Sequence, residues 1–270
     1  MKKILITGGS GFIGTYILRE LKNEYTIVLD LKTPKEKCSK YYKYNVLKPL
    51  DWIFEKEKPD IVIHLAAQTD VGRSIHNPKF DAKNNIIGSI NVFETSLKYK
   101  CKVVAANSAA ALDLQNPYGI SKHAMFLYSK YFKNVINLYL SNVYGKESKG
   151  VIGIIHRYLM GNTKKPFSLY GGKQIRDFVY VKDVARAFVR ALDFKGIDDF
   201  IISTNKGNNI LGAYLMAQTV YKIKKLYVVL AQKKNEIQES ILDNTKTIKK
   251  LKWKPLYTLK KGLEDMTKGG

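Results

Sequence analysis

The first fourteen residues constrain the fold of this chain most strongly. An apolar run, Ile4–Ile6, leads into three evenly spaced glycines, Gly8, Gly11 and Gly14, and an amphipathic run follows over Thr15–Lys22. This order predicts a strand, a tight turn and a helix, whose first amides can bind a pyrophosphate that the glycines let approach the backbone. The stretch therefore predicts a dinucleotide-binding turn, and the alternative is an ordinary strand-turn-helix with incidental glycines.

An acidic residue at the end of the next apolar run supports the first interpretation. The run Thr26–Leu29 ends in Asp30. A carboxylate at this position can accept hydrogen bonds from the adenosine ribose, and it disfavours the 2′-phosphate of NADP. We therefore expect NAD as the cofactor, although Lys32 and Lys35 close by leave NADP open.

Apolar and helical segments alternate along the first half of the chain. The predicted strands cover residues 3–7, 26–30, 60–65, 102–106 and 135–140, and the predicted helices lie near 12–22, 50–57, 82–99 and 118–132. Such alternation predicts right-handed crossovers and a parallel sheet with helices on both faces. We therefore predict an α/β fold, a Rossmann-type doubly wound parallel sheet with a smaller C-terminal α/β substrate lobe.

The pattern changes after about residue 145. We expect glycine turns at Gly150–Gly161 and Gly171–Gly172, helices near 183–193 and 212–222, a strand near 199–203, and two short helical patterns within Asn244–Lys268. We predict an NAD-binding domain over residues 1–145. Residues 146–270 are predicted to form mainly a substrate-binding lobe, with residues of about 177–205 returning to the main sheet.

Composition narrows the classes of partner. A net charge of +23 comes from scattered lysines without a recognisable nucleic-acid motif, which favours a solvated lysine surface over a nucleic-acid partner. The two cysteines, Cys38 and Cys101, lack a metal-ligand spacing, so we expect reduced thiols and no metal site. No apolar run reaches a membrane-spanning length. We therefore expect a cytoplasmic protein without a membrane partner.

A serine, a tyrosine and a lysine follow the fourth predicted strand. Ser108 ends the strand region, and Tyr118 and Lys122 stand four apart on the next predicted helix, where they share a face. A nearby ammonium favours phenolate, so we expect Lys122 to lower the pKa of Tyr118 towards neutrality. Such a phenol can exchange a proton with a sugar oxygen that Ser108 also binds, while a hydride moves to or from a nicotinamide. An incidental surface pair is the alternative for this Tyr-x-x-x-Lys spacing.

The third predicted strand leads into His64-Leu65-Ala66-Ala67-Gln68. Small residues at the carboxyl end of a strand let a cofactor lie across the sheet. We expect a structural role for His64.

Together these segments resemble the NAD-dependent nucleotide-sugar epimerase/dehydratase group of the extended short-chain dehydrogenases/reductases. The matching segments run nearly from end to end: Thr7–Gly14, His64–Gln68, Asn85–Ser89, Ser108 with Tyr118 and Lys122, Asn142–Gly145, Tyr170–Val181, and Asp243 with Leu251–Pro255.

The resemblance implies a role for each matching residue. Ser108, Tyr118 and Lys122 would be catalytic. The implied cofactor contacts are Gly8, Gly11, Phe12, Ile13, Gly14, Asp30, Asn45, Val46, Leu65, Ala66, Ala67, Asn85, Tyr118 and Lys122. The implied contacts to a nucleotide-diphosphate sugar, most simply a UDP-sugar, are Thr69, Ser108, Asn142, Arg176 and Lys233. The guanidinium of Arg176 has the planar geometry that suits a diphosphate. The resemblance also implies a homodimer through the helices near 82–99 and 118–132.

Departures from the family pattern narrow the activity. The segment Ala109–Pro117 is much shorter than the family loop that covers the sugar, and Tyr139 replaces a usual arginine. Ala109 and Ala110 stand where dehydratases carry an Asp-Glu pair. Without that acid and base, 4,6-dehydration is hard to catalyse.

We therefore expect a nucleotide-sugar 4-epimerase that oxidises and re-reduces the C4 hydroxyl through a keto intermediate, with Tyr118 as acid and base. One alternative is an NAD(P)H-dependent nucleotide-4-keto-sugar reductase. The other is a non-catalytic NAD-binding protein, against which Tyr118 and Lys122 argue.

Overall fold

A seven-stranded sheet organises the computed structural model, which describes residues 1–161, 165–232 and 237–268. The strand order is β10-β6-β5-β4-β1-β2-β3. The strands are β1 (Lys3–Thr7), β2 (Tyr25–Asp30), β3 (Lys40–Lys43), β4 (Ile61–His64), β5 (Lys102–Ser108), β6 (Val135–Leu140) and β10 (Asp199–Ile202). Every pairing from β3 through to β6 is parallel, and Leu5 of β1 lies between Ile27 of β2 and Val62 of β4. The predicted α/β, Rossmann-type sheet is therefore confirmed.

The chain divides into two compact units. Unit 1 comprises Met1–Leu140 with Ala185–Phe200, and unit 2 comprises Ser141–Val184 with Ile201–Gly270. The helix α9 (Val181–Asp193) carries the chain from unit 2 back into unit 1. Which ligand each unit binds stays a prediction.

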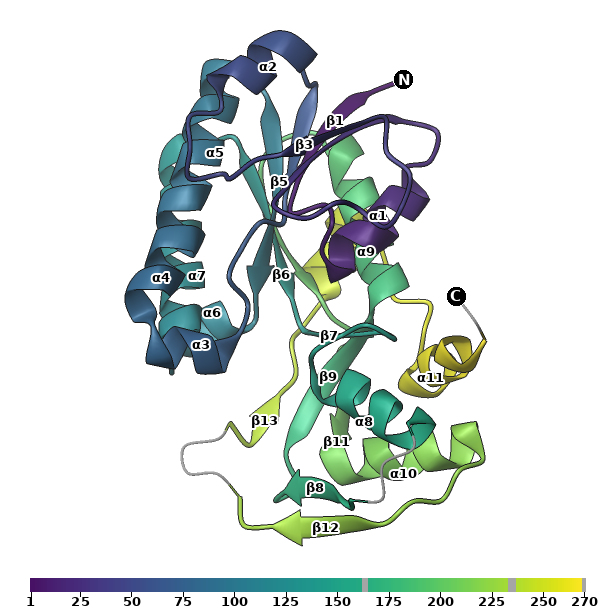
Figure 1. Cartoon of the computed structure of the whole chain (residues 1–270). Helices are drawn as coiled ribbons and strands as arrows, with labels where there is room; N and C mark the ends of the chain where they lie inside the picture. Colours follow the sequence, from purple (N-terminus) through teal and green to yellow (C-terminus); the bar gives the residue numbers. More distant parts are fainter. Residues whose placement is uncertain (162–164, 233–236, 269–270) are drawn as a thin grey trace. The chain divides into compact units, whose positions relative to one another are not determined.

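Helices cover both faces of the sheet in unit 1. They are α1 (Phe12–Glu20), α2 (Asp51–Glu57), α3 (Val71–His76), α4 (Pro78–Ala82), the π-helical segment η1 (Lys83–Ile87), α5 (Gly88–Lys98), α6 (Ala110–Asp113) and α7 (Pro117–Phe132). Figure 1 shows α5 and α7 on one side of the sheet and α1 on the other. Because both faces are covered, every residue of β4 and β6 is buried.

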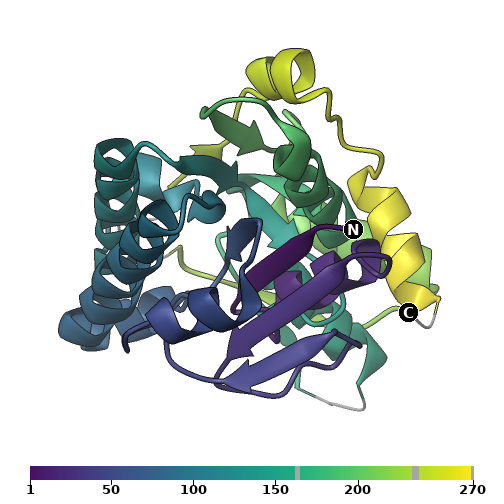
Figure 2. The same cartoon turned by 90° about the horizontal axis from the view of Figure 1, so that it is seen from above.

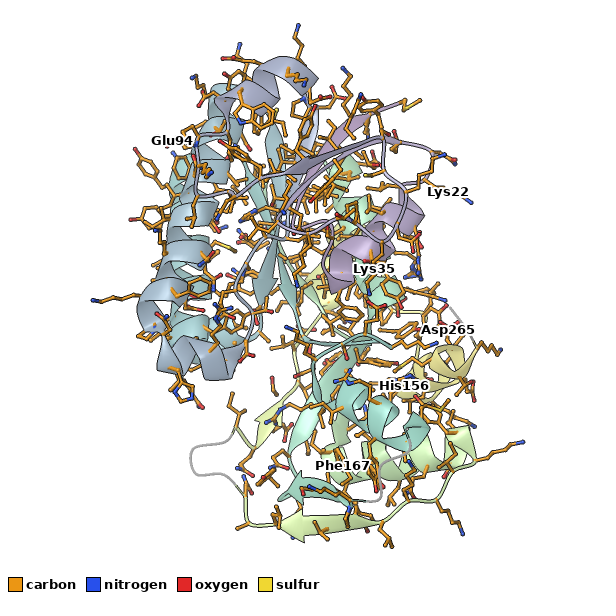
Figure 3. The ribbon with its side chains drawn as sticks, in the orientation of Figure 1. Lys22, Lys35, Glu94, His156, Phe167 and Asp265 are labelled. Carbon is orange, nitrogen blue, oxygen red and sulfur yellow. The ribbon has the colours of Figure 1, made fainter. Side chains whose placement is uncertain are left out.

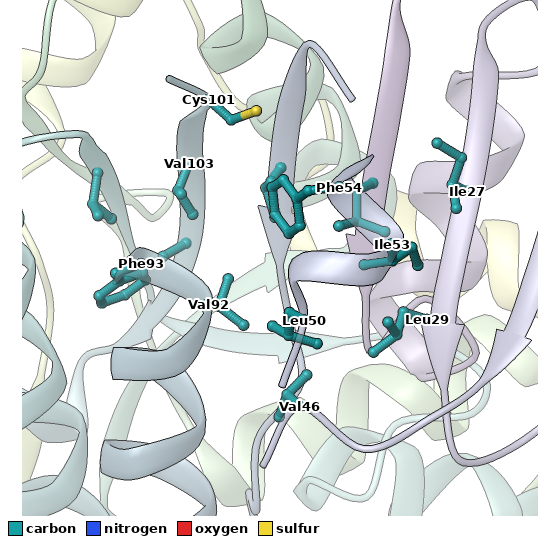
Figure 4. Close-up of a cluster of buried hydrophobic side chains, with 14 of the residues drawn as sticks. Ile27, Leu29, Val46, Leu50, Ile53, Phe54, Val92, Phe93, Cys101 and Val103 are labelled. Atoms are coloured by element: carbon teal, nitrogen blue, oxygen red, sulfur yellow. The ribbon is translucent and has the colours of Figure 1, made fainter. Parts of the chain in front are cut away.

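The core of unit 1 fills the space between the sheet and one helix layer. Figure 4 shows Ile27 and Leu29 of β2 facing Leu50, Ile53 and Phe54 around α2. Val92 and Phe93 of α5 and Val103 of β5 extend the same cluster. Packing of these apolar side chains aligns the strands and so brings their carboxyl ends to one edge of the sheet.

One strand of the sheet was missed by the sequence analysis. Lys40–Lys43 forms the edge strand β3, which pairs with β2 (Figure 2). Its sequence, Lys-Tyr-Tyr-Lys, has no apolar run because an edge strand is only half covered and carries lysines that discourage further pairing.

Unit 2 is built from short strands and three helices, within the part of it that the structure describes. The helices are α8 (Val151–Met160), α10 (Ile210–Tyr221) and α11 (Leu259–Thr267), and a π-helical turn, η2, covers Thr247–Leu251. The strand β9 (Ile175–Tyr180) pairs with β7 (Asn142–Tyr144), β11 (Gly207–Asn209) and β13 (Glu239–Ser240), and β8 (Phe167–Tyr170) pairs with β12 (Tyr227–Leu230).

The prediction of a glycine turn over Gly150–Gly161 is wrong. The two glycines are the caps of α8, and the residues between them form ten residues of helix. His156 of α8 lies within hydrogen-bond distance of the Tyr221 hydroxyl, 2.9 Å away, and Phe167 stacks on Tyr214. Figure 3 labels His156 and Phe167 in this unit and shows Lys22 and Glu94 of unit 1 extending outward.

The cysteine prediction is confirmed, because both Cys38 and Cys101 are free thiols. None of the helices in the described ranges combines the length and the apolar character that crossing a membrane requires.

Candidate active site

The glycine turn joins β1 to α1 in unit 1. Gly8 has a φ of 74°, and a Cβ at that position would lie 2.5 Å from the backbone nitrogen of Ala66. A Cβ on Gly14 would lie 2.5 Å from the carbonyl oxygen of Gly9. Both positions therefore require glycine. No side chain caps α1 at Gly11 in the described structure, so the amides of its first turn are available to an anion.

Asp30 lies at the carboxyl end of β2 beside this turn. One carboxylate oxygen accepts from the backbone nitrogen of Ser10 at 3.0 Å, and the other accepts from that of Lys32 at 3.0 Å. These bonds fix the carboxylate at the tip of the strand. The turn and the carboxylate therefore fit a dinucleotide whose ribose hydroxyls donate to Asp30.

Other predicted cofactor residues follow the neighbouring strands. Leu65 donates from its backbone nitrogen to Thr7 at 2.9 Å, which brings Leu65–Ala67 beside the glycine turn. Asn45 and Val46 follow β3, and the side chain of Asn45 accepts from the backbone nitrogen of Leu47. The carboxyl ends of the parallel strands thus gather these segments at one edge of the sheet.

Ser108, Tyr118 and Lys122 lie where β5 ends and α7 begins. The Ser108 side chain lies close enough to the partly buried Tyr118 to favour its phenolate. The buried Lys122 lies one turn further along α7, and its Nζ donates to the carbonyl of Ala106 at 2.7 Å. The structure therefore brings the three predicted catalytic side chains into one unit.

The expected effect of Lys122 on Tyr118 is corrected. Burial raises the pKa of Tyr118, the nearby Ser108 hydroxyl lowers it, and the charge of Asp81 raises it. Removal of the phenol from water outweighs the effect of Ser108, because the charged phenolate loses more solvation than the neutral phenol. Burial lowers the pKa of Lys122 to about 8. In this structure Ser108, and not Lys122, is the group that favours the phenolate.

His64 has a structural setting, as expected. Its Nδ1 lies 2.7 Å from Thr7 Oγ1, and its Nε2 lies 2.9 Å from Ser89 Oγ. The Ser89 hydroxyl donates to the carbonyl of Asn85, so it accepts from Nε2 and leaves Nδ1 to accept from Thr7. Burial lowers the pKa of His64 to about 3, and the ring is neutral at physiological pH.

A polar network beside Tyr118 was missed by the sequence analysis, apart from Asn85. Asn85 accepts from the backbone nitrogen of Gln68 at 2.8 Å and donates to the carboxylate of Asp81 at 3.1 Å. It also donates to Ser121, whose hydroxyl donates to the carbonyl of Tyr118 at 3.0 Å. Asn85 is buried in the π-helical turn η1, a feature that is frequent at functional sites. Asp81 was missed because the sequence shows it only as one polar residue within a helical pattern.

Unit 2 contains a cavity of about 850 Å³. Asn142 of β7 and Arg176 of β9 line it, and both were predicted to contact substrate. Arg157 and the aromatic residues Tyr158 and Phe167 also line it and were missed, because they come from segments without a recognisable spacing. The cavity therefore combines cationic and aromatic groups.

The predicted substrate residue Thr69 belongs to unit 1. Thr69 is exposed in the loop after β4, and its role stays a prediction. Lys233 lies outside the described residues.

The comparisons with known proteins agree with this architecture. A model of the NAD dependent epimerase/dehydratase family matches residues 4–202. A putative UDP-glucose 4-epimerase from Methanocaldococcus jannaschii is 32% identical over 294 residues, covering 97% of this chain and 96% of that protein.

Solved structures show the same fold. The UDP-glucose 4-epimerase of Thermotoga maritima, crystallised with UDP-glucose, has a TM-score of 0.90 and 30% identity over 98% of each chain. A Thermus thermophilus UDP-glucose 4-epimerase in complex with NAD has a TM-score of 0.87 and 24% identity over 99% of each chain.

The family match covers most of the chain, and the glycine turn with Asp30 fits the dinucleotide that the family uses. The predicted NAD cofactor and the predicted enzymatic class are confirmed on this basis. The chain belongs to the NAD dependent epimerase/dehydratase family.

Proposed function

We propose that this protein is a nucleotide-sugar 4-epimerase that inverts the C4 hydroxyl of a UDP-sugar through a keto intermediate. The observation that carries the proposal is the arrangement of Ser108, Tyr118 and the buried Lys122 at the end of β5 and the start of α7. These residue types supply a proton acceptor, a hydrogen-bond donor and a positive charge close to one reacting oxygen.

Tyr118 acts as the acid and the base in this proposal. Its phenolate removes the proton from the C4 hydroxyl, and the phenol later returns a proton to the C4 oxygen. Ser108 bonds the same oxygen and favours the phenolate before the first step and after the second. Bound NAD supplies hydride acceptance and hydride return at C4. The sugar inverts because it presents its other face before the second transfer.

The residues beside Ser108 support epimerisation over dehydration. Ala109 and Ala110 follow it, and Ala110 begins the short helix α6. Neither side chain can protonate a leaving hydroxyl or remove a C5 proton, which 4,6-dehydration requires.

The side chains that line the cavity of unit 2 support a substrate that contains a nucleotide diphosphate. Arg176 and Arg157 are guanidinium groups suited to phosphate oxygens, and Phe167 and Tyr158 offer rings for stacking of a base. The Thermotoga maritima relative was crystallised with UDP-glucose, and we therefore choose UDP-glucose as the first substrate to test.

The test begins with the purified protein and no added reductant. After desalting, the protein should retain NAD, and incubation with UDP-glucose or UDP-N-acetylglucosamine should produce the C4 epimer, detected by proton NMR. Absence of the epimer together with NADH or NADPH oxidation on a nucleotide-4-keto-sugar would replace the proposal with a reductase. Inactivity in both assays with NAD retained would indicate a binding protein.

We also propose a homodimer through α5 and α7. Leu97 of α5 and Leu127, Tyr128 and Tyr131 of α7 are between 43% and 77% exposed, and such apolar side chains on adjacent helices suit a helical interface. Light scattering after gel filtration should give twice the chain mass, and Leu127→Glu should give the monomer mass.

A further inference from the structure

Asp81 of α4 is a buried carboxylate with an incomplete set of partners. Its side chain is 1% exposed. One oxygen, Oδ1, accepts from Gln68 Nε2 at 2.8 Å and from Asn85 Nδ2 at 3.1 Å. The other oxygen, Oδ2, is buried without a hydrogen-bond partner in the described structure. Two neutral amides on one oxygen leave a buried negative charge only partly compensated.

Lys122 of α7 is a buried cation whose hydrogen-bond acceptors in the described structure carry no negative charge. Its Nζ donates to the carbonyl of Ala106 at 2.7 Å and contacts the sulfur of Met125 at 3.4 Å. Among the described ion pairs, none involves Lys122. A buried ammonium with one neutral oxygen acceptor is costly, and the carboxylate of Asp81 is the charge that acts favourably on it.

Hydrogen bonds connect Asp81 to the first turn of α7. Asn85, which donates to Asp81, also donates to Ser121 Oγ at 3.0 Å. The Ser121 hydroxyl donates to the carbonyl of Tyr118 at 3.0 Å. The helices α4 and α7 pack against each other, so the carboxylate, the amides and the start of α7 form one connected group.

We propose that Asp81 is a positioning residue for Tyr118 and Lys122: its buried carboxylate orients the side-chain amides of Gln68 and Asn85 and supplies the negative charge that keeps the Lys122 ammonium protonated. The catalytic part of this inference rests on the proposed function, whereas the electrostatic part concerns the protein alone. Nothing in the pattern of family motifs pointed to Asp81.

The negative charge of Asp81 shifts the pKa values of both Lys122 and Tyr118 upward. Asp81 opposes the burial that lowers the pKa of Lys122 to about 8, and it raises the pKa of Tyr118. The remaining titratable or charged side chains on α4 and the elements packed against it are Arg73 and His76 of α3, Lys79 of α4, Lys83 of η1, and His123, Tyr128, Lys130 and Tyr131 of α7. Of these, only His123 is not exposed, and its Nδ1 lies 3.0 Å from the carbonyl of Ala111. Asp81 is therefore the one buried carboxylate of this set.

The substitution Asp81→Asn isolates the charge. The amide oxygen can still accept from Gln68 and Asn85, and the new NH₂ group takes the place of the unpartnered Oδ2. We expect the pKa of Lys122 to fall by at least about half a pH unit, because the favourable negative charge is lost. The measurement is NMR titration of the protein labelled with ¹³C at lysine Cε, with the Lys122 signal assigned by its absence from Lys122→Met.

The pH profile of kcat provides a second test of the effect of the Asp81 charge. In Asp81→Asn the alkaline limb of the kcat profile should move to lower pH in parallel with Lys122, while the KM for UDP-glucose stays unchanged. A merely structural role would lower kcat by the same factor at every pH.

The control variant is Asp70→Asn, which removes an exposed carboxylate that accepts from the backbone of Arg73 in the same region. It should leave the Lys122 titration unchanged. An unchanged Lys122 midpoint in Asp81→Asn would overturn the proposal. If that variant does not fold, Asp81→Glu and Asp81→Gln make the same comparison at equal side-chain length. Because the titration needs no substrate, a shifted midpoint in a protein inactive on UDP-sugars would count against the proposed function alone.

Discussion

The two units hold their functional side chains in different surroundings. In unit 1, Ser108, Tyr118 and Lys122 stand among buried hydrogen-bonded groups, and each has a defined neighbour. In unit 2, Asn142 and Arg176 line a wide cavity together with cationic, aromatic and aliphatic side chains. Proton transfer requires fixed distances and controlled protonation states, whereas binding of a flexible ligand requires area and charge. The difference suggests that substitutions in unit 1 affect turnover and those in the cavity of unit 2 affect affinity.

The largest effect is expected at Tyr118, and it tests the unit 1 side of the comparison. Tyr118→Phe removes only the hydroxyl, so turnover should fall by about 10³-fold while NAD stays bound. Epimerisation rates and the NAD content after desalting check this. Tyr128→Phe, at an exposed tyrosine of the same helix, should turn over normally. Full activity in Tyr118→Phe would remove the catalytic assignment.

A stability effect is expected at Asp183, where unit 2 has its own buried carboxylate. Asp183 accepts from the backbone nitrogens of Leu256 and Tyr257 at 3.0 Å, and its carbonyl accepts from Trp253 Nε1 at 2.9 Å. Asp183→Ala leaves the partly buried backbone donors of Leu256 and Tyr257 without their acceptor, so the free energy of unfolding should fall by about 2 kcal/mol. Urea denaturation measures it, with Glu264→Gln at an exposed position of α11 as the control. An equal loss in both variants would show that the Asp183 contacts do not hold the C-terminal segment.

A moderate effect on affinity is expected at Arg176, and it tests the unit 2 side of the comparison. Arg176→Gln removes the charge that we propose binds phosphate, so the Kd for UDP should rise by about 10-fold or more with the NAD content unchanged. Isothermal titration with UDP provides the value. Lys173→Gln, at an exposed position before the same strand, should bind UDP as the wild type does. A lower kcat with unchanged UDP affinity would mean that the cavity does not hold the nucleotide.

A further effect, outside both proposed sites, is a pH dependence of stability that comes from His64. Its pKa is about 3 in the folded protein against an ordinary value of 6.5. Both states are neutral above pH 6.5, and on acidification the unfolded state gains a proton that the folded state cannot accept. The free energy of unfolding should therefore fall from pH 6.5 downward, by about 2 kcal/mol by pH 5.

Replacement of His64 should flatten this dependence. His64→Gln should lose less stability between those pH values than the wild type, whereas His76→Gln, at an exposed histidine, should keep the full slope. Urea denaturation at several pH values makes the comparison. An identical slope in His64→Gln would show that another group causes the acid sensitivity.

Part of the fold followed from local pattern alone. The β1–turn–α1 start and the strands β4, β5 and β6 were predicted because continuous apolar runs mark strands buried on both faces. The edge strand β3 was not predicted, since a half-covered strand lacks the continuous apolar run. The helix α8 was not predicted either, because glycines such as its caps Gly150 and Gly161 are also typical of turns. The π-helical turn at Asn85 was also missed, because its residues continue an ordinary helical periodicity.

The sequence by itself determined the dinucleotide turn, the acid at Asp30 and the set of Ser108, Tyr118 and Lys122, because each depends on residue spacing within one strand or helix. Only the tertiary structure decided the protonation of that set and the partners of Asp81. Burial and contacts between segments far apart in the chain control solvation and charge, and spacing along the sequence carries no measure of either. For that reason the expected lowering of the Tyr118 pKa was wrong, whereas the catalytic role of this residue stays a prediction.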